Sequence, residues 1–385
     1  MPRPFNLRGT FVINRLPPRA PARTTALTMS RPPAKTPAKT APEARTAYLV
    51  LGMHRSGTSA VTQLLALAGA ELPANVMPGD EHNAKGYFEP WKIAIFNDER
   101  LRAAGSAWDD PFAYPYRRLA GGEEQAWIDA ASALFDEEFP KAAWPLMKDP
   151  RATVLLPMWR KVLEAKGVAA RCVIPVRHPL AVAGSLRRRD GFADEKSVLV
   201  WSAYMLAAEA YTRDLPRAFV GYDALLADWR AEAAKIEAAH GAPLPNLTPK
   251  AAKEIDGFLT ADLRHNAVSD GLKGLGWAGE IAADVYAWFE AKAAGKSPKM
   301  ALLNGAAARL AERARDMGAL ISSTTRDLAA VRAELMEARA RLEVAQAFET
   351  EARASIARLE DGWRAAQSLL DAVDAELDAA LADEQ

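Results

Sequence analysis

The chain has 385 residues, and its 49 basic and 49 acidic side chains give a formal net charge of zero. Half of the residues are hydrophobic and a quarter are charged, which is ordinary for a globular protein and allows one large α/β domain with extensions. The balanced charge argues against a nucleic-acid-binding surface, and the single cysteine, Cys172, excludes an intramolecular disulfide and a cysteine-cluster metal site. No stretch approaches the ~18–20 apolar residues of a membrane span, and the N-terminus lacks the apolar core of a secretory signal, so we expect a cytoplasmic protein.

Residues 1–45 form a basic segment rich in proline and alanine. They carry nine Lys or Arg and one acid, Glu43, and show no hydrophobic period. Such a segment cannot bury enough apolar surface to offset its ordering entropy, so we expect it to be disordered. Met29, inside this segment, is an alternative translation start.

The first informative stretch is 47–67, AYLVLGMHRSGTSAVTQLLAL. Its beginning predicts a buried strand and its end a helix, and the glycine-containing loop between them makes an anion cradle, because loop amides turn inward and the helix N-terminus adds unpaired N–H groups. The spacing of Gly52 and Gly57 matches the phosphate loop of nucleotide hydrolases, but Thr58 stands where those enzymes have lysine. Arg55 is the strong cation of the loop. The residues expected to bind the anion are Gly52, His54, Arg55, Ser56, Gly57, Thr58 and Ser59.

The run GMHRSGTS resembles the 5′-phosphosulfate-binding loop of the sulfotransferase family, bacterial members included. The resemblance implies an α/β fold over residues 46–295, with a P-loop-like parallel sheet flanked by helices. It also implies 3′-phosphoadenosine 5′-phosphosulfate as the sulfuryl donor. No metal is expected, because Arg55, Lys148 and the loop amides would supply the positive field.

The loop 71–90 follows the first helix and is expected to meet the acceptor, since such loops carry function on α/β scaffolds. Sulfuryl transfer needs a base for the proton of the acceptor, and Glu89 is the first candidate, with His82 as the second. The stretch 83–89 resembles a segment near the acceptor in bacterial sulfotransferases. The alternative is that Glu89 caps a helix beginning at Trp91.

The run LMKDPR, residues 146–151, is expected to close a short strand with a charged turn. Related sulfotransferases carry a similar Lys-Asp-Pro-Arg, which implies that Lys148 neutralises charge on the bridging oxygen as the nucleotide leaves. The alternative is a structural turn held by an ion pair between Asp149 and Arg151. A helix is expected to follow over 153–166.

A second strand-to-helix junction begins with the predicted strand 171–176 and continues into Arg177. An arginine at a strand end and a serine two helical turns later, here Ser185, can converge on one phosphate. The resemblance implies that these two residues bind the 3′-phosphate, which distinguishes the sulfuryl donor from ADP. Trp108 is expected in the core or in the wall of the acceptor groove, and Tyr222 is expected to be structural.

The last part of the chain, 305–382, carries a strict seven-residue repeat that predicts a long α-helical coiled coil. Of the nine residues seven apart from Ile321, eight are apolar, and the same holds for the row from Thr324. The rod would span on the order of 90 Å at ~1.5 Å per residue. A coiled coil implies self-association or a partner protein. The alternative is a long helix folded back on the domain.

Three functions are compatible with these patterns. The first is a sulfotransferase acting on a hydroxyl or amine acceptor, for which analogy favours a glycan or glycolipid precursor. The second is a P-loop kinase of small molecules, which is weakened by the missing lysine. The third is a non-catalytic scaffold that presents the coiled coil on a degenerate nucleotide-binding fold.

Overall fold

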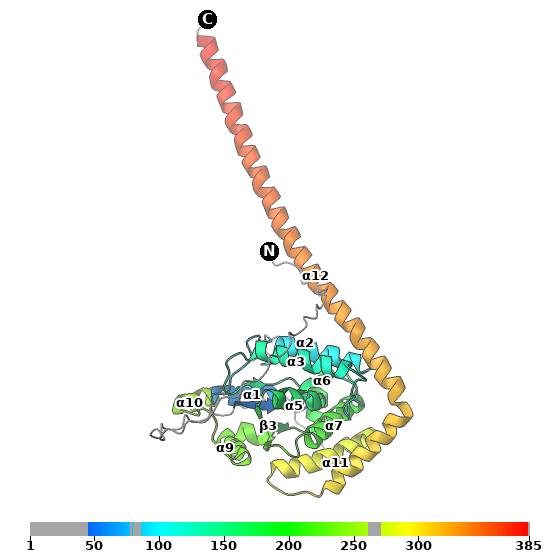
Figure 1. Cartoon of the computed structure of the whole chain (residues 1–385). Helices are drawn as coiled ribbons and strands as arrows, with labels where there is room; N and C mark the ends of the chain where they lie inside the picture. Colours follow the sequence, from blue (N-terminus) through cyan, green and yellow to red (C-terminus); the bar gives the residue numbers. More distant parts are fainter. Residues whose placement is uncertain (1–44, 78, 80–85, 261–270, 384–385) are drawn as a thin grey trace, which may run out of the picture. The chain divides into compact units, whose positions relative to one another are not determined.

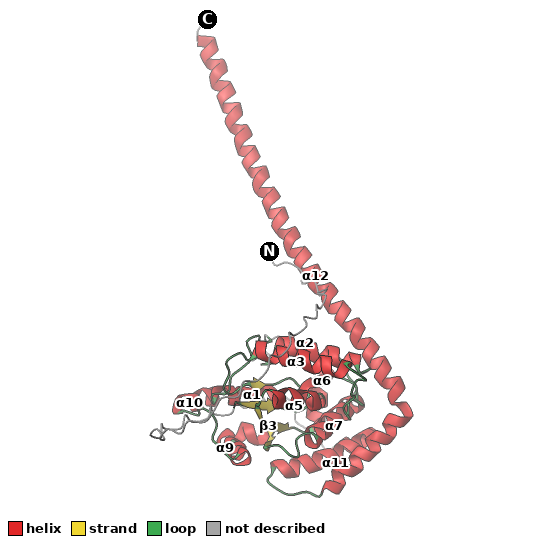
Figure 2. Cartoon of the chain, viewed as in Figure 1, coloured by secondary structure: helices red, strands yellow, loops and turns green. Residues whose placement is uncertain are grey.

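A computed structural model describes residues 45–77, 79, 86–260 and 271–383. A four-stranded parallel sheet, in the order β2-β1-β3-β4, forms the centre of the domain, with helices on both faces (Figure 1). The strands are β1 (Thr46–Val50), β2 (Leu146–Met147), β3 (Ala169–Val176) and β4 (Arg217–Gly221). The α/β class and the long C-terminal helix predicted from the sequence are therefore confirmed (Figure 2).

The helices connect the strands and then extend beyond them. They are α1 (Thr58–Leu67), α2 (Trp91–Ala103), α3 (Glu123–Glu138), α4 (Arg151–Val154), α5 (Leu156–Ala165), α6 (Pro179–Asp190), α7 (Asp194–Ala210), α8 (Tyr222–Ala227), α9 (Trp229–His240), α10 (Pro249–Phe258), η2 (Leu272–Leu275), α11 (Gly276–Ala293) and α12 (Met300–Asp383). The helix expected over 153–166 is broken at Leu155, because Pro157 in the first turn of α5 cannot donate a backbone hydrogen bond to the preceding turn.

Two apolar cores lie on the two faces of the sheet, because successive strand side chains point to opposite sides. Ala47 and Leu49 of β1 belong to the larger core, with Trp159 of α5 and Trp201 of α7. Tyr48 and Val50 belong to the second core, which is built with α1, α9 and α10. Burial on both faces fixes the register of the strands, so the turns that follow them are held on a rigid support.

The turns that follow the strands meet at the carboxyl edge of the sheet. Lys148 follows β2, the loop 51–57 follows β1, Arg177 follows β3 and Tyr222 follows β4. The chain leaves β1 for one neighbour, β2, and then crosses to the other neighbour, β3. This reversal is the place where open α/β sheets bind ligands.

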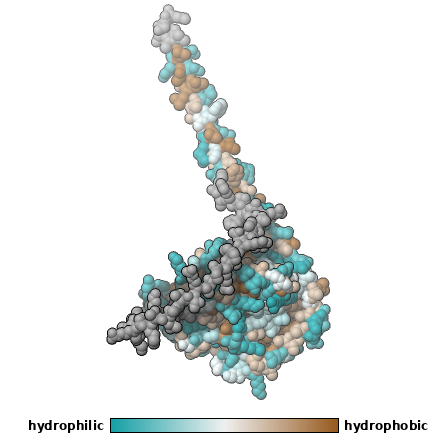
Figure 3. All heavy atoms as spheres, viewed as in Figure 1, coloured by the Kyte–Doolittle hydropathy of each residue, from teal (hydrophilic) through white to brown (hydrophobic). Residues whose placement is uncertain are grey.

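The helix α12 packs on the domain only with its first part. Leu303, Ala306 and Leu310 are fully buried in the larger core. Ser322 accepts a hydrogen bond from Arg117 of the domain at 2.8 Å. From Ala333 to Ala379 the side chains are exposed apart from two half-buried positions, and Figure 3 shows apolar residues at the surface of this helix.

Candidate active site

The loop 51–57 between β1 and α1 is held in a curled conformation. The N–H of Gly52 donates a hydrogen bond to Thr153 Oγ1 at 2.8 Å. Gly57 has φ +89°, and a Cβ at this position would lie 2.3 Å from Cδ2 of Tyr222. The turn therefore requires glycine at position 57 for both its backbone and its contact with the Tyr222 ring.

Two polar side chains of this loop are buried with an atom that has no hydrogen-bond partner among the described residues: His54 Nε2 and Ser56 Oγ. The side chains are 7% and 0% exposed. The His54 ring packs edge-on against Trp108, with 4.8 Å between ring centroids. A buried polar atom without a partner costs about 1–3 kcal/mol, so a ligand that made hydrogen bonds to these two atoms would offset that cost.

The imidazole of His54 is neutral. Burial is the largest cause that holds its pKa well below the usual range, and the charges of Arg151, Arg189, Lys148 and Arg55 add to it. The ring can thus offer one N–H donor and one acceptor, but no charge.

Arg55 connects the loop to the junction after β3. Its Nε donates to Ser185 Oγ at 2.8 Å, and its carbonyl oxygen accepts from Arg177 Nη1 at 2.9 Å. The two residues predicted to share a phosphate, Arg177 and Ser185, thus both contact Arg55. The Arg177 guanidinium also lies over the Tyr222 ring, 4.4 Å from its centroid.

Four arginines concentrate positive charge around this loop. Burial is the first cause that lowers the pKa of Arg55, and the charges of Arg189, Arg177 and Arg188 lower it further. Burial likewise lowers the pKa of Arg177. Charged groups whose pKa is depressed by desolvation and by like charges are stabilised when an anion binds between them.

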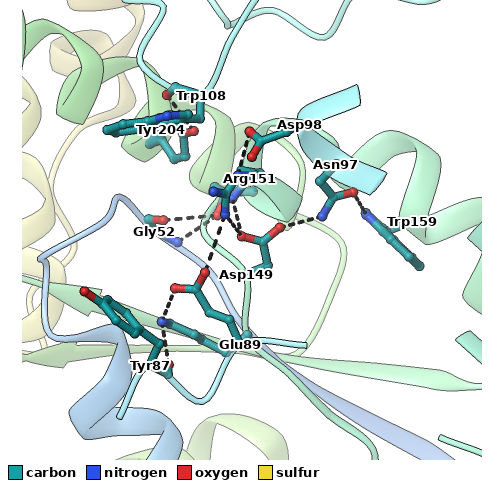
Figure 4. Close-up of polar contacts among 12 residues, drawn as sticks. Gly52, Tyr87, Glu89, Asn97, Asp98, Trp108, Asp149, Arg151, Trp159 and Tyr204 are labelled. Atoms are coloured by element: carbon teal, nitrogen blue, oxygen red, sulfur yellow. Dashed lines mark hydrogen bonds and ion pairs between the residues drawn. The ribbon is translucent and has the colours of Figure 1, made fainter. Parts of the chain in front are cut away.

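Glu89 and Lys148 form a buried ion pair beside the loop, shown in Figure 4. Lys148 Nζ lies 2.6 Å from Glu89 Oε1 and donates to the carbonyl oxygen of Tyr87 at 2.8 Å. The other carboxylate oxygen, Glu89 Oε2, lies 3.5 Å from Arg151 Nη1. Burial lowers the pKa of Lys148, although the neighbouring Glu89 carboxylate opposes that shift. Glu89 does not cap α2, which has no side-chain cap.

A second layer of buried polar groups positions this pair (Figure 4). Arg151 is bound by Asp149 at 2.7 Å and by Asp98 at 2.8 Å. Asp149 in turn accepts from the amide of Asn97 at 2.6 Å. The ion pair of Asp149 with Arg151, the structural alternative for the charged turn, is therefore present. The role of Lys148 toward a leaving nucleotide stays a prediction.

The structure places nearly all of the predicted residues at one edge of the sheet. Gly52 and Gly57 lie in the loop at positive φ, and Thr58 begins α1. Ser59 Oγ donates to the Tyr87 carbonyl oxygen at 3.4 Å, which joins α1 to the loop 71–90. His82 lies outside the described residues.

Sequence patterns did not predict the packing of Trp108 on His54 or of Tyr222 on Gly57. Both contacts join segments more than 50 residues apart, and no local spacing encodes them. Among the described residues, no group of three or more His, Cys, Asp or Glu side chains is arranged to hold a metal ion. No helix in the described ranges is long and apolar enough to cross a membrane.

Comparison with solved structures finds a distant structural likeness. No protein-family model matches the chain, and no curated protein matches it. The chain is similar to the sulfotransferase domain from the Synechococcus PCC 7002 olefin synthase, at a TM-score of 0.37 and 18% sequence identity. The match covers 64% of this chain and 97% of that domain.

Proposed function

We propose that the protein is a sulfotransferase that moves a sulfuryl group from 3′-phosphoadenosine 5′-phosphosulfate to a hydroxyl or amine acceptor. The observation that carries the proposal is the loop 51–57. It presents two buried polar atoms, His54 Nε2 and Ser56 Oγ, that have no partner in the described part of the chain and lie within a cluster of arginines. A polyanion with several acceptor oxygens satisfies both requirements, the hydrogen bonds and the charge.

The donor would bind along the carboxyl edge of the sheet. Its 5′-phosphosulfate occupies the loop and the first turn of α1, where the amides and the helix dipole favour an anion. Its 3′-phosphate binds to Arg177 and Ser185, which both contact Arg55. This arrangement prefers a nucleotide with separate 3′ and 5′ anions over one with a 5′-diphosphate.

Glu89 is the proposed base, since its Oε2 is held only loosely, 3.5 Å from Arg151. The acceptor oxygen attacks sulfur while its proton passes to Glu89, and the bond from sulfur to the bridging phosphate oxygen breaks. The electron pair of that bond stays on adenosine 3′,5′-bisphosphate. Lys148, whose pKa is lowered by burial, stabilises the charge that develops there. His82 is kept as the second candidate base.

The test is transfer of sulfur-35 from labelled donor to an acceptor library that includes glycans, glycolipids and simple alcohols. Label should appear in one class of acceptor with the wild-type protein. Glu89→Gln should lose at least a hundredfold in rate with the donor still bound, because a positioned base contributes roughly 10²–10⁴-fold. Equal rates for the two proteins would remove Glu89 from the mechanism. A cytoplasmic location remains a prediction from the sequence.

We also propose that α12 associates with a second copy of the chain through its heptad rows. The row of residues seven apart from Ile321, called the a row below, is exposed from Leu328 onward. Residues such as Leu342 (57% exposed) and Trp363 (67% exposed) leave apolar surface in water. Molar mass in solution tests this proposal. Leu342→Asp should produce monomers, whereas Val344→Asp, a more exposed position outside the two rows, should leave the mass unchanged.

A further inference from the structure

The two heptad rows of α12 differ in the size of their side chains. The a row, from Leu328 to Leu377, is made of leucine, isoleucine and tryptophan with one glutamate, Glu349. The d row, from Val331 to Val373, contains four alanines, two valines and one leucine. In this range the large a-row residues are 43–67% exposed. A partner helix must therefore pack against one row of large side chains and one row of small side chains.

The orientation of the partner decides which rows meet. In a parallel pair, each a residue faces the a residue of the partner and each d residue faces d, so leucine layers would alternate with alanine layers. A wide layer holds the two backbones apart at the neighbouring narrow layer, which leaves space there. In an antiparallel pair each a residue faces a d residue, so most layers combine one large and one small side chain, and the helices can pack at an even distance.

Glu349 favours the same orientation. In a parallel pair in register, it would face Glu349 of the partner, and two carboxylates would be buried against each other. In an antiparallel pair it faces a small d residue instead. Its carboxylate already contacts Arg353 of its own helix at 2.6 Å, which keeps one oxygen at the solvent side of the seam.

Every antiparallel register that pairs the two rows repeats each contact in reverse by two-fold symmetry, as a closed dimer requires. The register in which Leu328 faces Val373 of the second copy pairs the whole exposed seam from 328 to 373. Glu349 then faces Ala352, next to the symmetry axis. The same register places Leu335 opposite Ala366 and Trp363 opposite Ala338. It also places Arg339 beside Glu360 of the second copy, once on each side of the symmetry axis.

A parallel dimer would gain ion pairs between the two helices, but their contribution to stability is smaller than the cost of pairing two Glu349 carboxylates. It would place Asp327 beside Arg332 and Glu334 beside Arg339 of the partner. Exposed ion pairs contribute little to stability, and Arg332 is already bound to Asp109 of its own domain at 3.3 Å. The buried pair of Glu349 carboxylates weighs more than these contacts.

We infer that two copies of the chain pair through α12 as an antiparallel two-stranded coiled coil centred between Thr350 and Glu351. This inference rests on the self-association proposed above and adds its orientation and register. The sulfotransferase activity does not depend on it.

Energy transfer between fluorophores on the full chain tests the orientation. Ala333→Cys and Ser368→Cys place labels at exposed positions on the outer face of α12, and the antiparallel register brings them level with each other. The native Cys172 stays unlabelled, because burial raises the pKa of its thiol to about 12. Donor-labelled Ala333→Cys mixed with acceptor-labelled Ser368→Cys should show strong transfer after exchange. Mixtures labelled at one position should show weak transfer, because those labels lie about 50 Å apart along the axis.

The outcomes separate the two proposals. Strong transfer within the Ser368→Cys mixture, with weak transfer in the mixed pair, would replace the antiparallel arrangement by a parallel one and leave self-association intact. A monomeric mass for the unlabelled protein would overturn both self-association and the orientation. Neither result would bear on binding of the sulfuryl donor.

Discussion

Replacement of Arg177 by alanine is the sharpest test of the proposed 3′-phosphate site. The guanidinium is half-buried at the end of β3, over the Tyr222 ring and 2.9 Å from the carbonyl oxygen of Arg55. Burial lowers its pKa, so its charge is poorly solvated and an anion there is bound strongly. Removing a charged contact to a phosphate should cost roughly 2–4 kcal/mol, or about 30- to 1000-fold in affinity for adenosine 3′,5′-bisphosphate.

The assay is calorimetric titration of that bisphosphate, and Arg187→Ala is the matched control. Arg187 lies on α6 with a side chain that is 61% exposed and an ion pair with Asp194 at 3.4 Å. Solvent and salt screen such a charge, so its removal should weaken binding less than about threefold. Wild-type affinity in Arg177→Ala, or equal losses in both variants, would refute the assignment and leave only a general effect of charge.

Three further predictions concern the loop and the core. Gly57→Ala should weaken bisphosphate binding at least tenfold, because its Cβ would overlap the Tyr222 ring. The control Gly167→Ala is also at positive φ but in open space, so it should cost only about 1–2 kcal/mol of stability. Equal bisphosphate affinity in the two variants would contradict the predicted overlap. In the unliganded protein, His54→Asn should remove a pH dependence of the free energy of unfolding. The pKa of His54 in the folded state lies below the unfolded value of about 6.5, so the unfolded state binds a proton first and wild-type stability falls by up to about 1.4 kcal/mol per pH unit below pH 6. If urea unfolding showed the same pH dependence of stability for the wild type and the variant, a buried neutral imidazole would be disproved. The Cys172 thiol, with a pKa raised to about 12 by burial, should resist alkylation at pH 8 until urea unfolds the protein, and rapid modification of the native state would refute its burial.

Local sequence signals predicted the scaffold of the site. A short apolar run before Gly52 and another before Arg177 mark β1 and β3, and both are parallel neighbours in the sheet. The carboxyl ends of parallel neighbours lie at the same edge, which is why two motifs about 125 residues apart contact each other through Arg55 and Ser185. The apolar runs and the order of the strands were therefore sufficient to predict that these two motifs lie together.

The remaining contacts depend on packing between distant segments. Lys148 and Glu89 are 59 residues apart in the chain, and the placement of β2 and of the loop 71–90 brings them to a distance of 2.6 Å. A sequence can show that each is chemically competent, but not that they pair. The contact of α12 with the domain likewise depends on residues far apart in the sequence. Its heptads predict the long helix, whereas the contact of Ser322 with Arg117 uses a side chain outside both rows.

Comparing the binding of two isomeric nucleotides to the wild-type protein tests the sulfotransferase proposal. Adenosine 3′,5′-bisphosphate and ADP carry two phosphates each and differ in where the second is attached. Without magnesium, we expect the 3′,5′ isomer to bind at least tenfold more tightly, because Arg177 and Ser185 hold the separate 3′ anion. Tighter binding of ADP would contradict the sulfotransferase proposal and favour a kinase. Binding of neither would favour a scaffold.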